Sequence, residues 1–138
     1  MITSIISEII QQISQNNSVP VYSAFDAVSI EKKSKEFFTT VGLNSFDLQT
    51  PIYSAFTIFI PYKAEIDINV TAPENYSMQK LYEYFSDNIK SALNDISGMN
   101  CSIRKISMKH DSNINRLVLM ARFSVSGIDK IERSSEWI

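Results

Sequence analysis

The chain has 138 residues, of which 44% are hydrophobic and 20% charged, and its 13 basic and 15 acidic residues give a formal net charge of -2. This length suits one domain that buries its own core, and the composition excludes the low hydrophobicity and high charge of a disordered chain. The charges are scattered, with no basic stripe that would neutralise a row of phosphates. We therefore expect a single domain over residues 1–138, with no specific nucleic-acid partner.

The first predicted element is an amphipathic helix from about Thr3 to Gln15. Its isoleucines recur at the spacing of one helix face and are Ile2, Ile5, Ile6, Ile9, Ile10 and Ile13. The segment has no basic region before its apolar run and no small-residue cleavage site, so we expect it to stay on the mature protein. No later segment is apolar over the length that a membrane span needs, so we expect no membrane partner.

Short strands and an exposed connection are predicted next. The segment VPVYSAF (19–25) predicts an edge strand, because Pro20 cannot donate a ladder hydrogen bond. The segment DAVSIEKKSK (26–35) is charged and has little periodicity, which indicates an exposed connection. Aromatic and β-branched residues then predict strands over 36–43 and 46–48.

The longest β-rich region covers residues 52–72 and contains Pro61. Residues 52–60 are largely apolar on both faces, which predicts a central strand covered on both sides. Residues 64–72 alternate instead, with Glu65, Asp67 and Asn69 on the face opposite the apolar residues. One bent strand and two neighbouring strands both fit this pattern.

A second helix is predicted from an N-cap at Ser77 to a stop at Gly98. Beyond it, two apolar strands around the turn DSN (111–113) predict an antiparallel hairpin. This order of elements predicts an α+β fold, in which two amphipathic helices pack on one face of a mixed, mainly antiparallel sheet.

No residue pattern in the chain predicts catalysis. Glu65 and Asp67 could share a cation, but calcium or magnesium needs oxygens from more than one segment, so a solvated strand face is favoured. His110 with Asp111 could suggest an acid–base pair, but it lies at the predicted hairpin turn without a second histidine, so a surface turn is favoured. The single cysteine, Cys101, has the pattern of a small buried residue. The three glycines are too dispersed for a phosphate-binding loop. We therefore expect no enzyme activity, no cofactor and no metal site.

Two features suggest contacts with other proteins. Lys32, Lys33 and Lys35 could bind an acidic surface, although a solvated connection is favoured. The chain also has more aromatic residues than one small core needs, and aromatic residues are enriched at protein interfaces. Trp137 near the end of the chain is a candidate anchor for a neighbouring subunit.

The order and character of these segments resemble the small tail-terminator, or tail-completion, proteins of tailed phages and phage-derived contractile particles of Gram-positive bacteria. The segments that carry the resemblance are VPVYSAFD, KKSKEFFTTVGL, PIYSAFTIFIPYKAEIDINVTAP, SMQKLYEYFSDNI and RLVLMARFSVSGI. They cover most of the chain.

The resemblance implies a structural protein that caps the head-proximal end of a tail tube as a ring, usually a hexamer, and ends polymerisation of tube and sheath. It also implies contacts with tube and sheath proteins, assembly in the bacterial cytoplasm and a final place in the virion or phage-tail-like particle. Closed rings use two different patches of each subunit. We expect these patches at exposed strand edges and at the loop FDAVSIEKKSKE (25–36), with Glu65 and Asp67 facing water, the ring lumen or a neighbour.

Two alternatives fit the same sequence. Another small structural component of such a particle, in the neck or baseplate, would share this composition and differ in its partners. A free-standing α+β domain that binds a small molecule would require a concave pocket.

Overall fold

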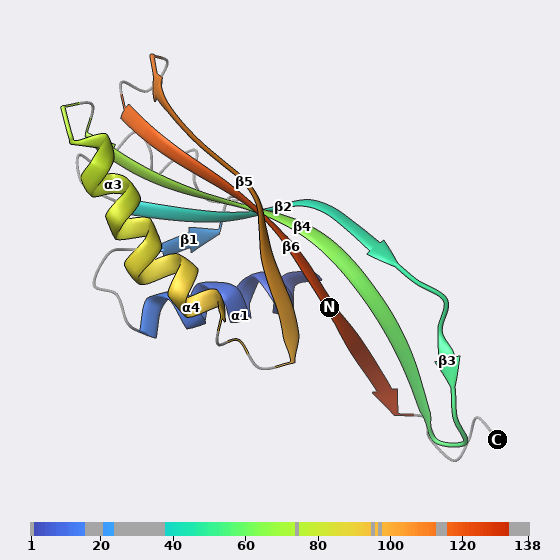
Figure 1. The fold of residues 1–138 in the computed structure, drawn as a ribbon. Coiled ribbons are helices and arrows are strands. Elements are labelled where there is room, and N and C mark those ends of the chain that lie inside the picture. Colours follow the sequence, from blue (N-terminus) through green and yellow to red (C-terminus); the bar gives the residue numbers. More distant parts are fainter. Residues whose placement is uncertain are drawn as a thin grey trace.

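A computed structural model describes residues 2–15, 21–23, 38–73, 75–94, 96, 98–112 and 116–132 of the chain. In chain order its elements are α1 (Ile2–Gln15), β1 (Val21–Ser23), β2 (Phe38–Leu48), β3 (Ile52–Tyr53), β4 (Thr57–Pro73), α3 (Met78–Tyr84), the π-helix η1 (Phe85–Lys90), α4 (Ser91–Asn94), β5 (Met99–Asp111) and β6 (Arg116–Glu132) (Figure 1). The fold is α+β, as the sequence predicts.

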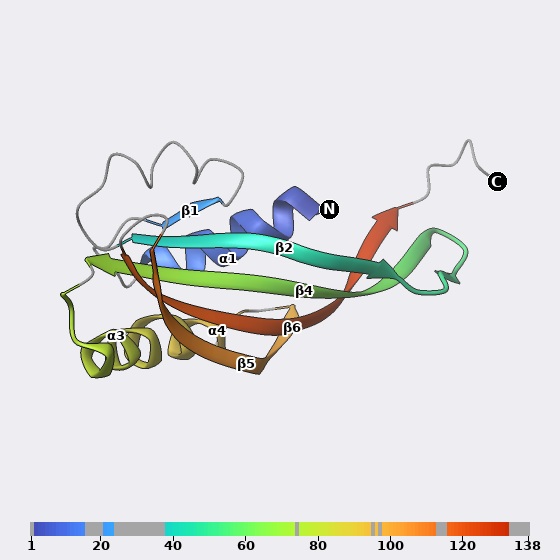
Figure 2. The same ribbon diagram turned by 90° about the horizontal axis from the view of Figure 1, so that it is seen from above.

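The six strands form one mixed, mainly antiparallel sheet with the order β1-β2-β4-β6-β5. β3 also pairs with β4, beyond the end of β2. β1 runs parallel to β2, and all other pairs are antiparallel. β4 and β6 are 17 residues each and pair along their whole length, so they form the long axis of the sheet (Figure 2).

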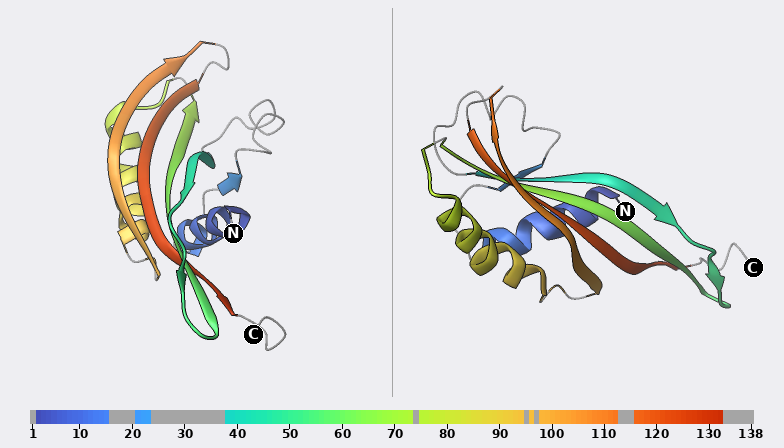
Figure 3. Two further views of the ribbon diagram at one scale, coloured as in Figure 1. Left: turned by 90° about the vertical axis from the view of Figure 1, so that its right-hand side faces the viewer. Right: turned by 45° about the horizontal axis from the view of Figure 1, so that its top comes forward.

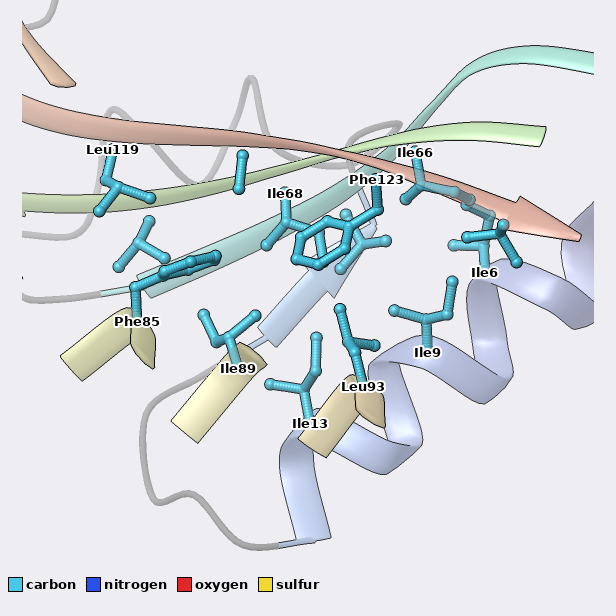
Figure 4. Close-up of a cluster of buried hydrophobic side chains, with 14 of the residues drawn as sticks. Ile6, Ile9, Ile13, Ile66, Ile68, Phe85, Ile89, Leu93, Leu119 and Phe123 are labelled. Atoms are coloured by element: carbon cyan, nitrogen blue, oxygen red, sulfur yellow. The ribbon is translucent and has the colours of Figure 1, made fainter. Parts of the chain in front are cut away.

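Both helical segments cover the same face of the sheet, as the sequence predicts. Figure 4 shows their apolar side chains meeting those of the central strands: Ile6, Ile9, Ile13, Phe85, Ile89 and Leu93 from the helices, and Ile66, Ile68, Leu119 and Phe123 from the sheet. Each fully buried aliphatic side chain stabilises the fold by about 1.5–3 kcal/mol. This layer of contacts is therefore the main source of stability.

α1 is held by packing rather than by intrinsic helix propensity. Ile5, Ile6, Ile9 and Ile13 are buried, whereas Glu8 on the opposite side is exposed. β-branched residues lose side-chain freedom in a helix, so isoleucine is a poor choice for an isolated helix. None of the described helices has both the length and the apolar character needed to cross a membrane.

The second helical segment is not the regular α-helix that the sequence suggests, because η1 interrupts it. Leu81, Phe85, Ile89 and Leu93 are spaced by four and are all buried. In an α-helix, residues four apart rotate by about 40° relative to each other, so this stripe would turn away from the sheet. The wider turn of a π-helix counteracts that rotation. The apolar period of four therefore fits the mixed helix better than a regular one.

The predicted start of this segment is confirmed, whereas its predicted stop at Gly98 lies beyond Asn94, where the described helix ends. The Ser77 Oγ accepts a hydrogen bond from the backbone N–H of Lys80 at 3.4 Å, as expected of an N-cap. Gly98 has a φ of 83°, in the left-handed region that glycine adopts at little cost.

β4 is one continuous strand that passes through Pro61, which decides between the two patterns that the sequence allows. The Pro61 carbonyl accepts a hydrogen bond from the Gln49 N–H at 2.8 Å, so the nitrogen of Pro61 also points to the β2–β3 side. At this position β2 has ended and β3 has not begun. The missing N–H of proline therefore coincides with a gap in the ladder.

β2 is also one strand, where the sequence predicts two pieces. Its register against β4 shifts between Leu43 and Ser45, which makes Asn44 a bulge residue. Beyond the bulge, the ring of Phe46 stacks on the ring of Tyr62 with centroids 5.6 Å apart. The predicted hairpin of β5 and β6 is confirmed, and β6 continues to Glu132, further than its apolar run indicates.

Candidate functional site

The sheet continues beyond the helices as a projecting arm. We define the arm as residues 48–61 and 127–132, which comprise β3 with the first residues of β4 and the last residues of β6. Both views in Figure 3 show this end of the sheet reaching away from the helices. The rest of the sheet, with the helices that cover it, is called the body below.

The arm carries most of the large apolar side chains that are exposed among the described residues. Leu48, Ile52, Tyr53, Phe56, Ile128 and Ile131 are 57%, 58%, 66%, 64%, 60% and 39% exposed, respectively. Large exposed apolar clusters on soluble proteins commonly mark binding surfaces. The arm is therefore the strongest candidate for a functional surface.

The prediction that residues 52–60 form a central strand covered on both sides is wrong. Ile52 and Tyr53 lie in the short strand β3, Phe56 lies in the turn, and only the residues from Thr57 onward belong to β4. The apolar pattern itself is real, but none of the described helices covers either face of the arm (Figure 1). The apolar side chains of the arm are therefore exposed, and the sequence pattern alone does not separate that case from burial within the chain.

The register of the arm places apolar rows on both of its faces. On the face that continues the helix-covered side, Tyr53 pairs with Ile58, which pairs with Ile131. On the opposite face, Ile52 pairs with Phe59, which has Lys130 as its other neighbour, and Pro61 pairs with Ile128.

Local hydrogen bonds fix the shape of the arm. At its tip the Ser54 N–H donates to the Thr57 carbonyl at 2.8 Å, and the Thr57 N–H donates to the Ser54 Oγ at 3.1 Å. The Lys130 Nζ lies 5.7 Å from the centroid of the Phe59 ring, within the range of a cation–π contact. The arm is thus an ordered strand structure that presents its apolar side chains in fixed rows.

Asp67, one of the predicted interface residues, is held in an ion pair on the face of the sheet opposite the helices. Its Oδ1 and Oδ2 accept hydrogen bonds from the Nε and Nη2 of Arg122 at 2.8 and 3.1 Å, across the β4–β6 pair. The hydrogen bond and negative charge of Asp67 raise the pKa of the Arg122 guanidinium. This carboxylate is occupied in joining two strands.

Glu65 lies two residues away on the same face but has a different partner. Its Oε2 accepts a hydrogen bond from the Nδ2 of Asn44, the bulge residue of β2, at 3.0 Å. No group of three or more histidine, cysteine, aspartate or glutamate side chains that could hold a metal ion occurs among the described residues. Glu65 and Asp67 therefore contribute to cross-strand bonding, and the polar row does not form a cation cage.

The other predicted interface residues cannot be placed in the same way. Lys32, Lys33, Lys35 and Trp137 lie outside the described residues.

His110 and Asp111 are consecutive in β5 and so point to opposite faces of the sheet, which does not suit an acid–base pair. Cys101 is only half-buried rather than fully buried, and burial raises the pKa of its thiol.

A hollow of about 210 Å³ lies beside α1 and is lined by Glu8, Gln11, Gln12, Gln15 and Ile96. Its lining is mostly polar and its volume is below the roughly 300–1,000 Å³ typical of small-molecule sites, which are also mainly apolar. This hollow gives little support to the small-molecule alternative.

No family model matches the chain, and no curated protein matches it. Solved structures similar to this chain include the core region of PilO from the type IV pilus system of Pseudomonas aeruginosa, at 12% identity and a TM-score of 0.28, covering 76% of this chain and 88% of that one. Another is the type 4 fimbrial biogenesis protein PilO from Pseudomonas aeruginosa, at 13% identity and a TM-score of 0.28, covering 64% of this chain and 58% of that one. Similarity at this TM-score supports no argument about function.

Proposed function

We propose that this protein is a structural subunit that forms a ring, caps the head-proximal end of a phage or phage-tail-like tube, and thereby ends polymerisation of tube and sheath. The observation that carries the proposal is the arm, whose apolar rows extend beyond the helical layer on both faces. The resemblance of the sequence to tail-terminator proteins gives this assembly role its specific place in a particle.

The geometry of the arm suits contact with another subunit. A strand structure that carries apolar side chains on both faces gains stability when a second protein covers them, at roughly 25 cal/mol per Å² of apolar area buried. Because the arm projects from one end of the subunit, the surface that covers it lies on another molecule. On that molecule it is a patch other than the arm. Rings require such heterologous contacts.

The proposed mechanism is complementarity and has no catalytic step or cofactor. One side of the ring continues the contacts that tube subunits make with each other, and the other side lacks the surface that would accept a further tube ring. The partners are further copies of this chain, six in the usual ring of the family, together with tube and sheath proteins. Assembly takes place in the bacterial cytoplasm, and the ring then remains in the particle.

The proposal is tested by light scattering after size-exclusion chromatography and by electron microscopy of tubes assembled with and without this protein. The tube protein is taken from the coding neighbourhood of this gene, where the proposal expects tube and sheath genes immediately downstream. We expect a ring in solution or at tube ends, and shorter tubes when the protein is present. A monomer at all concentrations, with tube lengths unchanged, would overturn the proposal. Binding at the opposite, baseplate end of the tube would also overturn it.

A matched pair of variants tests the role of the arm. The double variant Tyr53→Ser and Phe56→Ser removes two exposed apolar side chains of the arm, and Met78→Ser with Tyr82→Ser removes two exposed ones of α3. We expect self-association or tube capping to weaken at least about tenfold in the arm variant, because two anchor residues of an interface commonly contribute more than 1 kcal/mol each. The α3 variant should assemble like the wild type. Equal assembly of all three proteins would contradict a role for the arm.

A further inference from the structure

The two edges of the sheet differ in charge and in how they are covered. β5 forms one edge with 13 residues, and no described strand lies beyond it. On the other edge, β1 pairs only with Thr39–Val41 of β2, so the described part of the chain leaves the edge from Gly42 to Tyr53 without a neighbouring strand. Unpaired N–H and C=O groups along such edges are templates for a further strand.

We propose that β5 of one subunit adds as an antiparallel strand to the Gly42–Tyr53 edge of the next subunit, so that the sheets of neighbouring subunits join. This inference rests on the proposed ring and names the surfaces that close it. It assigns the occupant of both edges as a second copy of this chain.

Strand direction supports this pairing. β2, β4, β6 and β5 are antiparallel in turn, so β5 runs opposite to β2. A second copy that continues the sheet in the same orientation therefore presents its β2 antiparallel to β5. The antiparallel ladder is also the slightly more stable of the two pairings.

Charge also favours contact between unlike edges. β5 carries Arg104, Lys105 and Lys109, all exposed. Residues 38–53 contain no lysine or arginine and one acidic residue, Asp47, which is exposed. Pairing β5 with the β5 of another copy would place these three cations against three more, which is unfavourable for directly opposed residues. Pairing with the β2–β3 edge avoids that repulsion and gives the cations an acidic neighbour.

The lengths of the two edges also match. β5 has 13 residues and the free edge from residue 42 to residue 53 has about the same extent, interrupted at Pro51. Because β1 occupies Thr39–Val41, an added strand is displaced toward the arm. That displacement brings the neighbouring subunit close to exposed Leu48, Ile52 and Tyr53, so edge pairing and burial of the arm occur in one contact.

Cysteine cross-linking tests the inference directly. In a Cys101→Ala background, Ser45→Cys on β2 is mixed with Ser102→Cys or Ser107→Cys on β5; these three serines lie on the face of the sheet opposite the helices. Because each chain carries one cysteine, a short bismaleimide can join only different subunits. We expect cross-linked dimers from at least one mixture, at least fivefold above a mixture of Ser45→Cys with Ser86→Cys on η1.

The outcomes separate this inference from the proposed function. Rings that shorten tubes but give no cross-link above the control would overturn the edge pairing and leave the capping role intact. Dominant cross-linking of Ser45→Cys with itself would show pairing of like edges and would also overturn it. Absence of rings with unchanged tube lengths would overturn the proposed function and the inference together.

As an independent readout, we expect the triple variant Arg104→Glu, Lys105→Glu and Lys109→Glu to weaken ring formation at least tenfold. Mixing it with the Asp47→Lys variant should restore rings in which the two variants alternate. At each contact between them, the β5 edge of one variant and the β2 edge of the other then carry opposite charges. Circular dichroism of the triple variant checks that it is folded. A folded triple variant that forms rings like the wild type would contradict the pairing.

Discussion

The body and the arm are parts of the same strands, yet the body buries its apolar side chains whereas the arm leaves them exposed. β4 passes through both: Ile66 and Ile68 in the body are fully buried under the helices, whereas Ile58 and Ile60 in the arm are only partly covered. What changes along β4 is the layer above it. Where α1 and the second helical segment end, the chain supplies no further described cover, and a partner subunit is the proposed replacement.

The largest expected difference between body and arm is in stability. Phe85 is fully buried and its ring lies 6.2 Å from that of Phe123, so Phe85→Ala should lower the free energy of unfolding by about 3–5 kcal/mol. Phe56 is exposed at the tip of the arm, and Phe56→Ala should change it by no more than about 0.5 kcal/mol. Urea denaturation of the dilute protein measures both values.

The same two variants can also contradict the contrast between a buried body and an exposed arm. If Phe56→Ala destabilised the dilute protein by more than about 2 kcal/mol, the arm would be part of the folding core, and its exposed residues would not be reserved for a partner. The measurement is best made at several protein concentrations, because stabilisation that depends on concentration would show that assembly contributes to it.

The sequence predicted the body well because its periodicities report burial by the chain itself. The alternation from Ala64 to Ala72 placed the correct face on the core, and Ser77 marked the start of the second helical segment. The described helix ends at Asn94, before the predicted stop at Gly98. The π-helical interior escaped prediction, although the apolar spacing of four from Leu81 to Leu93 contained a signal for it.

The arm and the candidate interface were much harder to predict. An apolar run such as residues 52–60 is the same whether another layer of the chain covers it or another molecule does. The polar row of Glu65 and Asp67 was placed on the correct face, but its partners, Asn44 and Arg122, come from other strands. The register between neighbouring strands decides which residues become partners, and the local sequence pattern does not specify that register.

A second prediction concerns the boundary between body and arm, where Gly127 faces Tyr62. A Cβ at position 127 would lie 2.6 Å from the Tyr62 Oη and 2.8 Å from its Cζ. Tyr62 is buried and stacked on Phe46, so its ring cannot move away freely. Gly127→Ala should therefore lower the free energy of unfolding by about 1–3 kcal/mol, measured in urea.

The Tyr62→Phe background provides the control for this prediction. Without the hydroxyl, the shortest contact of the new Cβ is lost, so Gly127→Ala should cost less there than in the wild type. An equal cost in both backgrounds would show that the glycine is needed for another reason, such as its backbone conformation.

The smallest expected effect comes from titration in the body. Burial raises the pKa of the Tyr62 hydroxyl, with smaller contributions from the charges of Glu8, Cys101 and Asp129, and burial also raises the pKa of the Cys101 thiol. For both groups the folded protein holds the proton more tightly than the unfolded chain does. The stability that they contribute is complete below their ordinary pKa values, 9.0 for the thiol and 10.0 for the phenol, and is lost as pH rises beyond them.

Urea denaturation from about pH 7 to about pH 10.5 measures this loss. We expect the free energy of unfolding to fall with a shallower slope just above pH 9 in Cys101→Ala than in the wild type, because the unfolded chain then has no thiol to ionise first. Exposed Ser102 is the neighbouring control, and Ser102→Ala should keep the wild-type slope. Since the comparison uses slopes, any loss of packing in Cys101→Ala at neutral pH does not affect it. Identical slopes for Cys101→Ala and the wild type would contradict the raised pKa of the thiol. They would mean that the folded protein holds the thiol proton no more tightly than the unfolded chain does, so that Cys101 is not part of the buried body.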